Sequence, residues 1–186
     1  GAGASSTTYV DDVFSTYLYD GNGSTQNIVN GLDLSGEGGL VWIKARNQSY
    51  NHFLFDTARG ASSTITADGT GAAFTTSRIS SFNNNGFSLG TDDFGNGSGS
   101  EYVAWTFRKQ SKFFDIVTYT GNGYNRTISH NLGSVPGMIL IKRTSGTEDW
   151  YGYHRSMANG QSYSSATGGQ MGLNQTSATN NTSSSA

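Results

Sequence analysis

One stretch of this chain occurs twice, and that duplication limits the possible folds more than any single motif does. Residues 14–60 reappear in degraded form as residues 114–158. The first part of the repeat aligns at an offset of 100 residues and the remainder at an offset of 98. A self-similarity of this length indicates one structural unit used twice. The sequence therefore predicts two related units, over residues 1–110 and 111–186.

Strand and turn signals dominate both copies of the repeat. The 186 residues include 26 Gly and a single Pro, and they are rich in Asn, Ser and Thr, which favours short strands joined by tight turns. Tyr102–Phe107 alternates apolar residues on one face, as a half-buried strand does. No segment has helical apolar spacing over three turns. We therefore expect an all-β fold of tandem β-sandwich or jelly-roll units, similar in type to lectins.

The expected strands differ in number between the two units. They are Val10–Tyr19, Leu40–Lys44, His52–Asp56, Ser63–Thr66, Ala72–Thr76, Gly86–Leu89 and Tyr102–Arg108, followed by Phe114–Tyr119, Arg126–Ser129, Met138–Lys142, Trp150–His154 and Gln170–Asn174. The second unit has no counterpart of Tyr102–Arg108, so its sheet would expose a raw edge. We expect either that the protein continues beyond Ala186 or that another chain supplies the missing strand.

Charge and cysteine content argue against several classes of protein. The net charge is −2, without the clustered Lys and Arg that a nucleic-acid partner requires. No apolar run approaches the roughly 20 residues of a membrane helix, so no membrane insertion is expected. The absence of cysteine excludes disulfides, cysteine zinc sites and thiol catalysis. We expect no cofactor.

Several motifs in combination resemble a domain of phage particles. They are Gly39–Lys44, His52–Gly60, Ser81–Gly90, Tyr102–Phe107, Val117–Gly123, His130–Lys142 and Asp149–His154. Together they resemble an uncharacterised repeat domain in virion structural proteins of marine bacteriophages and cyanophages, often described as tail-fibre-like. The resemblance implies a non-enzymatic structural module of a fibre, spike or decoration protein. Such a module would be exposed on the exterior of the virion and would contact other virion proteins. By analogy with fibres the resemblance also implies a homo-oligomer, with a trimer expected.

One pentapeptide matches the nucleophile elbow of hydrolases. Gly86–Gly90 fits the pattern G-x-S-x-G with Ser88 at its centre. An elbow places its Ser on a sharp turn from a strand into a helix, whereas residues 91–97 read as a loop. We interpret the pentapeptide as a strand with Phe87 and Leu89 directed inward.

The histidines and the acidic residues do not form a repeated catalytic pattern. His52 aligns with Trp150 and His154 aligns with Asp56, so candidate triad or metal groups are not kept between the copies. The third histidine, His130, reads as a turn residue. The clustered acids are Asp92, Asp93, Glu101, Glu148 and Asp149. A glycan depolymerase, the remote alternative, would need two carboxylates facing one cleft about 5–10 Å apart.

Two acidic segments have structural interpretations. Asp92, Asp93 and Glu101 supply oxygen atoms in a Gly-rich loop, which suits calcium in chemistry but not in EF-hand spacing. The competing interpretation is a solvated acidic turn. Asp56 and Arg59 lie within one turn of each other, so we expect a bidentate ion pair at the exit of a strand.

Aromatic residues next to polar loops are the candidates for ligand binding. Trp150, Tyr151 and Tyr50 could stack on sugar rings, and Asp149 and Asn47 could form hydrogen bonds with sugar hydroxyls. Packing in the core is the competing role, and for Trp150 the two are evenly balanced. A carbohydrate-binding adhesin or receptor-binding domain, with a host-surface glycan as ligand, is therefore the alternative to a purely structural module.

Overall fold

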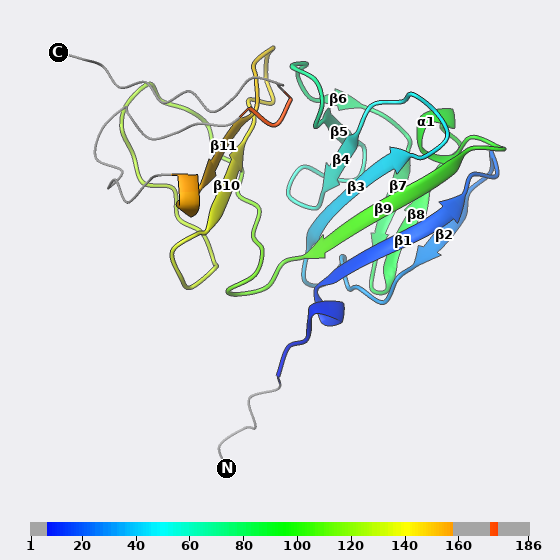
Figure 1. Ribbon diagram of the computed structural model, residues 1–186, viewed down its shortest axis with the longest axis horizontal. Helices are drawn as coiled ribbons and strands as arrows, with labels where there is room; N and C mark the ends of the chain where they lie inside the picture. Colours follow the sequence, from blue (N-terminus) through cyan, green and yellow to red (C-terminus); the bar gives the residue numbers. More distant parts are fainter. Residues whose placement is uncertain (1–6, 158–171, 175–186) are drawn as a thin grey trace.

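Antiparallel sheets are the main regular structure of the computed structural model, which describes residues 7–157 and 172–174 (Figure 1). The strands are β1 (Phe14–Asp20), β2 (Gln26–Val29), β3 (Gly39–Ala45), β4 (Phe53–Asp56), β5 (Ser63–Thr66), β6 (Phe74–Thr75), β7 (Ile79–Asn83), β8 (Gly86–Leu89), β9 (Glu101–Arg108), β10 (Met138–Ile141) and β11 (Tyr151–His154). The described helical elements are short, namely η1 (Val10–Asp12), α1 (Asp93–Asn96) and η2 (Arg155–Met157). The expected all-β class is confirmed, and tandem jelly rolls stay a prediction. No described helix has the length and apolar character to cross a membrane.

The first unit packs two sheets against each other. The larger sheet has the order β1-β9-β3-β4-β5-β6 and the smaller one β2-β8-β7, and β7 and β8 lie behind β3 and β9 in Figure 1. Strand alternation turns Val41 and Ile43 of β3 toward the smaller sheet, where they join Phe87 and Leu89 of β8 in one apolar core. The inward orientation of Phe87 and Leu89 was expected from the sequence.

Most expected strands of the first unit are present, with three differences. The strand expected from Val10 starts only at Phe14, because η1 precedes it. Strands β2 and β7 were missed, since only Ile28 in β2 and Ile79 in β7 are buried and the apolar pattern is therefore weak. The segment read as a loop contains the single helical turn α1, which Asp92 caps.

The two copies of the repeat share one hairpin with the same register. In the first copy β3 pairs with β4 from Leu40↔Asp56 to Ile43↔Phe53. In the second, β10 pairs with β11 from Met138↔His154 to Ile141↔Tyr151. Every pair of the second hairpin is the first-hairpin pair moved by 98 residues, which is the offset found in the sequence. The self-similarity is therefore structural.

The rest of the second unit does not repeat the first. The expected strands over 114–119 and 126–129 are wrong, because neither range is in a strand. Of the expected strand Gln170–Asn174, residues 172–174 are described and are in no strand, and the other two lie outside the described residues. Their first-copy counterparts β1 and β2 pair only with β9 and β8, respectively. Both partner strands come from the later part of the repeat. The described part of the second unit ends before that part, so within the described residues neither range has a strand to pair with.

The second hairpin is tied to the β5–β6 edge of the first unit. Trp150 packs against Leu54 and Ile65 in a second apolar cluster. Its indole Nε1–H donates a hydrogen bond of 2.8 Å to the Thr66 carbonyl. Backbone hydrogen bonds join the two units as well, for example from the Ala73 amide to the Thr144 carbonyl at 2.9 Å.

Candidate functional site

A cleft of about 500 Å³ opens in the first unit between the β4–β6 region and α1. Four aromatic residues contribute to its lining, namely Tyr50, Phe53, Phe74 and Phe94. Small polar residues, among them Ser49, Asn51 and Thr66, line it as well. Arg78 is the one charged residue of the lining. An aromatic cleft with a single cation is suited to binding a ligand that combines apolar faces with a negative charge.

The Arg78 guanidinium lies among three aromatic rings. Its Cζ atom is 4.1 Å from the ring centre of Phe53, 5.2 Å from that of Phe94 and 5.6 Å from that of Phe74. Each contact of this kind contributes about 0.5–2 kcal/mol, depending on how far it is desolvated. Arg78 is only 6% exposed. The rings therefore hold the cation at the wall of the cleft.

The hydrogen-bonding capacity of Arg78 is only partly used. Its Nε lies 2.9 Å from Asp92 Oδ1, an ion pair without the alignment of a hydrogen bond. Its Nη1 is buried and has no hydrogen-bond partner within the described chain. Burial lowers the pKa of Arg78, while Asp92 acts in the opposite direction. The guanidinium stays charged at neutral pH, as arginine does in proteins.

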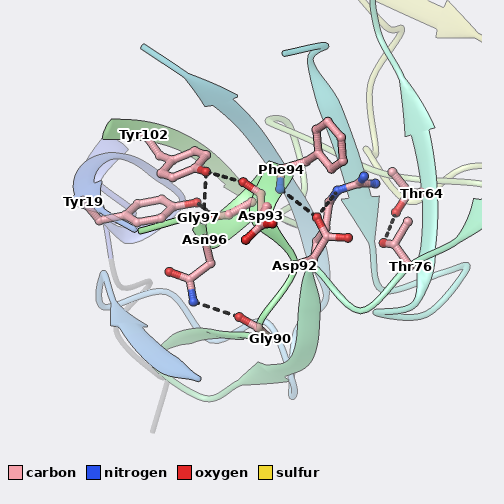
Figure 2. A network of polar contacts seen from close by, with 12 residues as sticks. Tyr19, Thr64, Thr76, Gly90, Asp92, Asp93, Phe94, Asn96, Gly97 and Tyr102 are labelled. Atoms are coloured by element: carbon pink, nitrogen blue, oxygen red, sulfur yellow. Dashed lines mark hydrogen bonds and ion pairs between the residues drawn. The ribbon is translucent and has the colours of Figure 1, made fainter. Parts of the chain in front are cut away.

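Asp92 connects the cation to α1. Its Oδ1 accepts a 2.9 Å hydrogen bond from the Phe94 amide, which caps the helical turn (Figure 2). The same oxygen atom is the partner of Arg78 in the ion pair. One carboxylate therefore positions both the guanidinium and the Phe94 ring beside it.

Two stacked tyrosines hold α1 in place from the other side. The Tyr102 hydroxyl donates to the Asp93 carbonyl at 2.7 Å and accepts from the Gly97 amide at 3.0 Å (Figure 2). The Tyr19 hydroxyl donates to the Gly95 carbonyl at 2.8 Å, and the two phenol rings stack with centres 5.1 Å apart. Burial raises the pKa of both tyrosines, so both hydroxyls keep the proton that they donate.

The residues predicted to bind glycans in the first unit have different roles. Tyr50 lines the cleft, and its ring packs on Phe94 with centres 4.8 Å apart. Asn47 holds the turn before β9, because its Oδ1 accepts from the Glu101 amide at 2.9 Å and its Nδ2 donates to the Gly99 carbonyl at 3.3 Å. Only Tyr50 is therefore placed to touch a ligand in the cleft.

The glycan-binding role considered for Trp150 does not fit its position in the structure. Trp150 is 6% exposed and belongs to the core that joins the two units, so its ring has no free face for a sugar. Tyr151 is on the surface of β11 and donates to Glu148 Oε1 at 3.1 Å, and this contact raises the pKa of the phenol. Asp149 accepts a 2.8 Å hydrogen bond from Asn174 Nδ2.

The carboxylates considered for calcium are directed to different partners. Asp92 pairs with Arg78, and Glu101 pairs with Arg46 at 3.3 Å. Asp93 is the first residue of α1. Among the residues described, no group of three or more His, Cys, Asp or Glu is arranged to hold a metal ion. The structure therefore does not assemble the three acids into a calcium site.

The expected ion pair between Asp56 and Arg59 is present in a modified form. Arg59 Nε lies 2.6 Å from Asp56 Oδ2, and both side chains are nearly buried. The second carboxylate oxygen accepts from the Arg59 backbone amide at 2.9 Å, so the carboxylate is bidentate but the guanidinium is not. Arg59 Nη2 donates instead to the Leu54 carbonyl at 3.3 Å. The pair closes the turn after β4.

The residues that mimic catalytic motifs make structural hydrogen bonds. His52 Nδ1 accepts from Trp42 Nε1 at 3.0 Å, and burial lowers the pKa of this histidine, which favours the neutral acceptor form. His130 and His154 accept from amides two residues ahead of each. Ser88, in the middle of β8, donates to Asn27 Oδ1 at 2.7 Å.

Arg78, the central residue of the cleft, was missed by the sequence reasoning. It lies between Ser77 and Ile79 without a local motif. The rings around it come from positions about 4 to 25 residues away in the chain, on β4, β6 and α1. Only the fold brings them together, so no spacing rule could have found the site.

These features define a β-sandwich protein with an aromatic cleft around one buried arginine. Residues 10–186 match the family model of a domain of unknown function, DUF7483, and the chain belongs to this family. No curated protein and no solved structure shows significant similarity to it.

Proposed function

We propose that the chain is a non-enzymatic structural module of a phage particle, exposed on its exterior in a fibre, spike or decoration protein. We further propose that it assembles by accepting a β-strand along the open edge of β10. The resemblance of its motifs to virion repeat domains supports the setting. The difference between the two hairpins supports the mechanism.

The observation that carries the proposal is the exposure of β10. Its residues Met138 to Ile141 are 39–49% exposed, although all four are apolar. At the equivalent positions of β3, Val41 and Ile43 are fully buried. Strand β3 lies between β4 and β9, whereas in the described part of the chain β10 pairs with β11 only.

The first unit indicates which kind of strand would cover this edge. There β9 runs antiparallel to β3 and pairs with it from Gly39↔Arg108 to Ala45↔Tyr102. An open edge offers unpaired backbone N–H and C=O groups, and a strand added to it gains main-chain hydrogen bonds and side-chain pockets together. Each hydrogen bond contributes about 0.5–1.5 kcal/mol net. The proposed occupant is therefore an antiparallel strand with the alternation of β9.

Such an edge offers an attachment point to other virion proteins or to further copies of this chain. A strand supplied by a neighbour would link subunits through the same pairing that stabilises the first unit. A homotrimer remains the expectation from fibre analogy. Since the linkage needs only backbone pairing and apolar contact, it requires no catalytic group.

A peptide with the sequence of Glu101–Arg108 tests the proposed assembly. Added to the full chain, it should slow amide hydrogen exchange over Met138–Ile141 and raise the melting temperature. A peptide of the same composition with the alternation scrambled is the matched control. Equal effects of the two peptides, or no effect of either, would contradict the proposed strand acceptance.

A carbohydrate-binding adhesin is the second candidate, and the cleft beside Tyr50 favours it. Retention of the protein on immobilised glycans, lost on Tyr50→Ala, would support this role. Trp150→Ala is not a suitable probe of glycan contact, because Trp150 is in the core between the units.

A further inference from the structure

We infer that the cleft around Arg78 binds a carboxylate-bearing sugar, such as a uronate residue of an acidic polysaccharide. The inference concerns the first unit and is independent of strand acceptance at β10. It rests on the incompletely paired guanidinium, on the aromatic rim and on the distribution of charge around the cleft.

The guanidinium has donors left for a ligand. Arginine carries five N–H donors, and the ion pair with Asp92 is made at Nε. Nη1 is buried without a hydrogen-bond partner in the described residues. A buried donor without a partner is costly in free energy and is uncommon in proteins. A ligand carboxylate would satisfy it in a charge-assisted hydrogen bond, since the planar carboxylate matches the guanidinium fork.

The charges around the cleft leave this position open to an anion. Asp92 is the counter-ion of Arg78, but its carboxylate is on the Nε side and also caps α1. Asp68 beside the cleft accepts a hydrogen bond from the His52 amide at 3.1 Å. A second cation, Lys44, is outside the lining but contacts one of its residues, because its Nζ donates to the Tyr50 carbonyl.

The remainder of the cleft suits a sugar ring. Phe74 and Phe94 are 42% and 46% exposed, so each has a ring surface available to the C–H groups of a sugar. Ser49, Asn51 and Thr66 can form hydrogen bonds with hydroxyls. The volume of about 500 Å³ falls within the range of small-molecule pockets.

Entry of the carboxylate requires one ring to move. Nη1 is covered in the structure, and Phe74 is the most distant of the three rings around Arg78. Phe74 is on β6, a strand of two residues at the edge of the sheet. Its ring can therefore turn outward with little loss of packing.

An NMR titration of the full chain with trigalacturonate tests the inference. The acid should shift the Arg78 Nε–H signal and the amides of Tyr50 and Phe94. The fully methyl-esterified trimer, which has the same ring without the charge, should bind at least about tenfold more weakly. Acetate, which has the charge without the ring, should also bind at least about tenfold more weakly. Equal binding of the acid and ester would overturn the carboxylate assignment, and equal binding of acetate would overturn the sugar assignment.

Asp92→Asn separates a ligand site from a purely structural ion pair. Asn caps a helix about as well as Asp, so α1 should be kept while the competing negative charge is removed. We expect several-fold tighter binding of trigalacturonate together with lower stability of the fold. Lower stability with unchanged affinity would show that Arg78 serves the structure alone.

Arg78→Gln should abolish binding, with Arg126→Gln as the matched control. Arg126 also contacts an aromatic ring, that of Tyr119 at 5.8 Å, but it is in the second unit away from the cleft lining. Its substitution should leave the affinity unchanged. An equal loss in both variants would indicate general charge attraction and contradict the site. If Arg78→Gln fails to fold, the comparison of the acid with its methyl ester and the Asp92→Asn variant still test whether Arg78 binds a carboxylate.

Discussion

The hairpins β3–β4 and β10–β11 have the same register, but the first is buried in a core and the second is largely exposed to solvent. Ile43 and Ile141 are the same residue at the same position of the two hairpins, opposite Phe53 and Tyr151. Ile43 is fully buried, whereas Ile141 is 43% exposed. The hairpin is therefore determined locally, but its burial depends on strands that come later in the chain.

The second hairpin obtains its stability from a different source. Strand β3 pairs with β9, whereas the β10–β11 hairpin packs against the first unit through Trp150. The residue aligned with Trp150 in the first copy is His52, which makes a hydrogen bond within its own unit. The two copies thus share a backbone pattern and differ in how the pattern is anchored. This comparison yields three predictions.

Trp150→Ala should have the largest effect. It removes a buried indole and its hydrogen bond to Thr66, and truncation of a buried Trp costs about 3–5 kcal/mol. Chemical denaturation should show this loss of stability, and hydrogen exchange should show that it is concentrated in β10 and β11. Trp150→Phe keeps an aromatic ring and should cost less. A loss below about 1 kcal/mol in Trp150→Ala would contradict the anchoring role.

The pair Ile43→Ala and Ile141→Ala should differ clearly. Truncation of the buried Ile43 should cost about 2–5 kcal/mol. At Ile141 the same change removes a half-exposed side chain, so a loss below about 1 kcal/mol is expected. The two losses of stability should be measured by urea denaturation under identical conditions. Similar losses in the two variants would mean that β10 is covered as β3 is.

Asp115→Asn should have the smallest effect on stability, and the effect should be seen as a change in how stability depends on pH. Asp115 aligns with Ser15 of β1 but forms contacts that Ser15 lacks, with the Asn131 amide at 2.7 Å and with Lys109 at 2.9 Å. Burial alone would raise the pKa of Asp115, but these hydrogen bonds outweigh it and lower the pKa.

The sign of the pH effect follows from the lowered pKa. The stabilisation is present above the unfolded-state pKa of about 3.9 and is lost as the pH falls through the lower folded-state value. Denaturation at pH 7 and below pH 4 should therefore show a loss of about 1–3 kcal/mol in the wild type that Asp115→Asn does not show. Identical pH profiles of the two proteins would rule out this contribution.

Local patterns were sufficient to predict much of the first unit. The alternation in Tyr102–Phe107 and the compact apolar runs at β3 and β8 predicted strands that are present. The error over 114–119 has a physical cause, since a strand pattern also needs a partner strand. Trp150 was ambiguous because alternation alone does not say which face meets another unit. Arg78 carried no local signal, since its aromatic contacts form only in the folded sheet.

Amide hydrogen exchange of β3 and β10, resolved by residue in the full chain, tests the central claim most directly. In β3 the amides on both edges should be protected, because β4 and β9 pair with it from either side. In β10 the amides directed away from β11 should exchange about 100-fold faster or more than their counterparts in β3. Protection of all β10 amides to the level found in β3 would contradict the open edge and the assembly mechanism built on it.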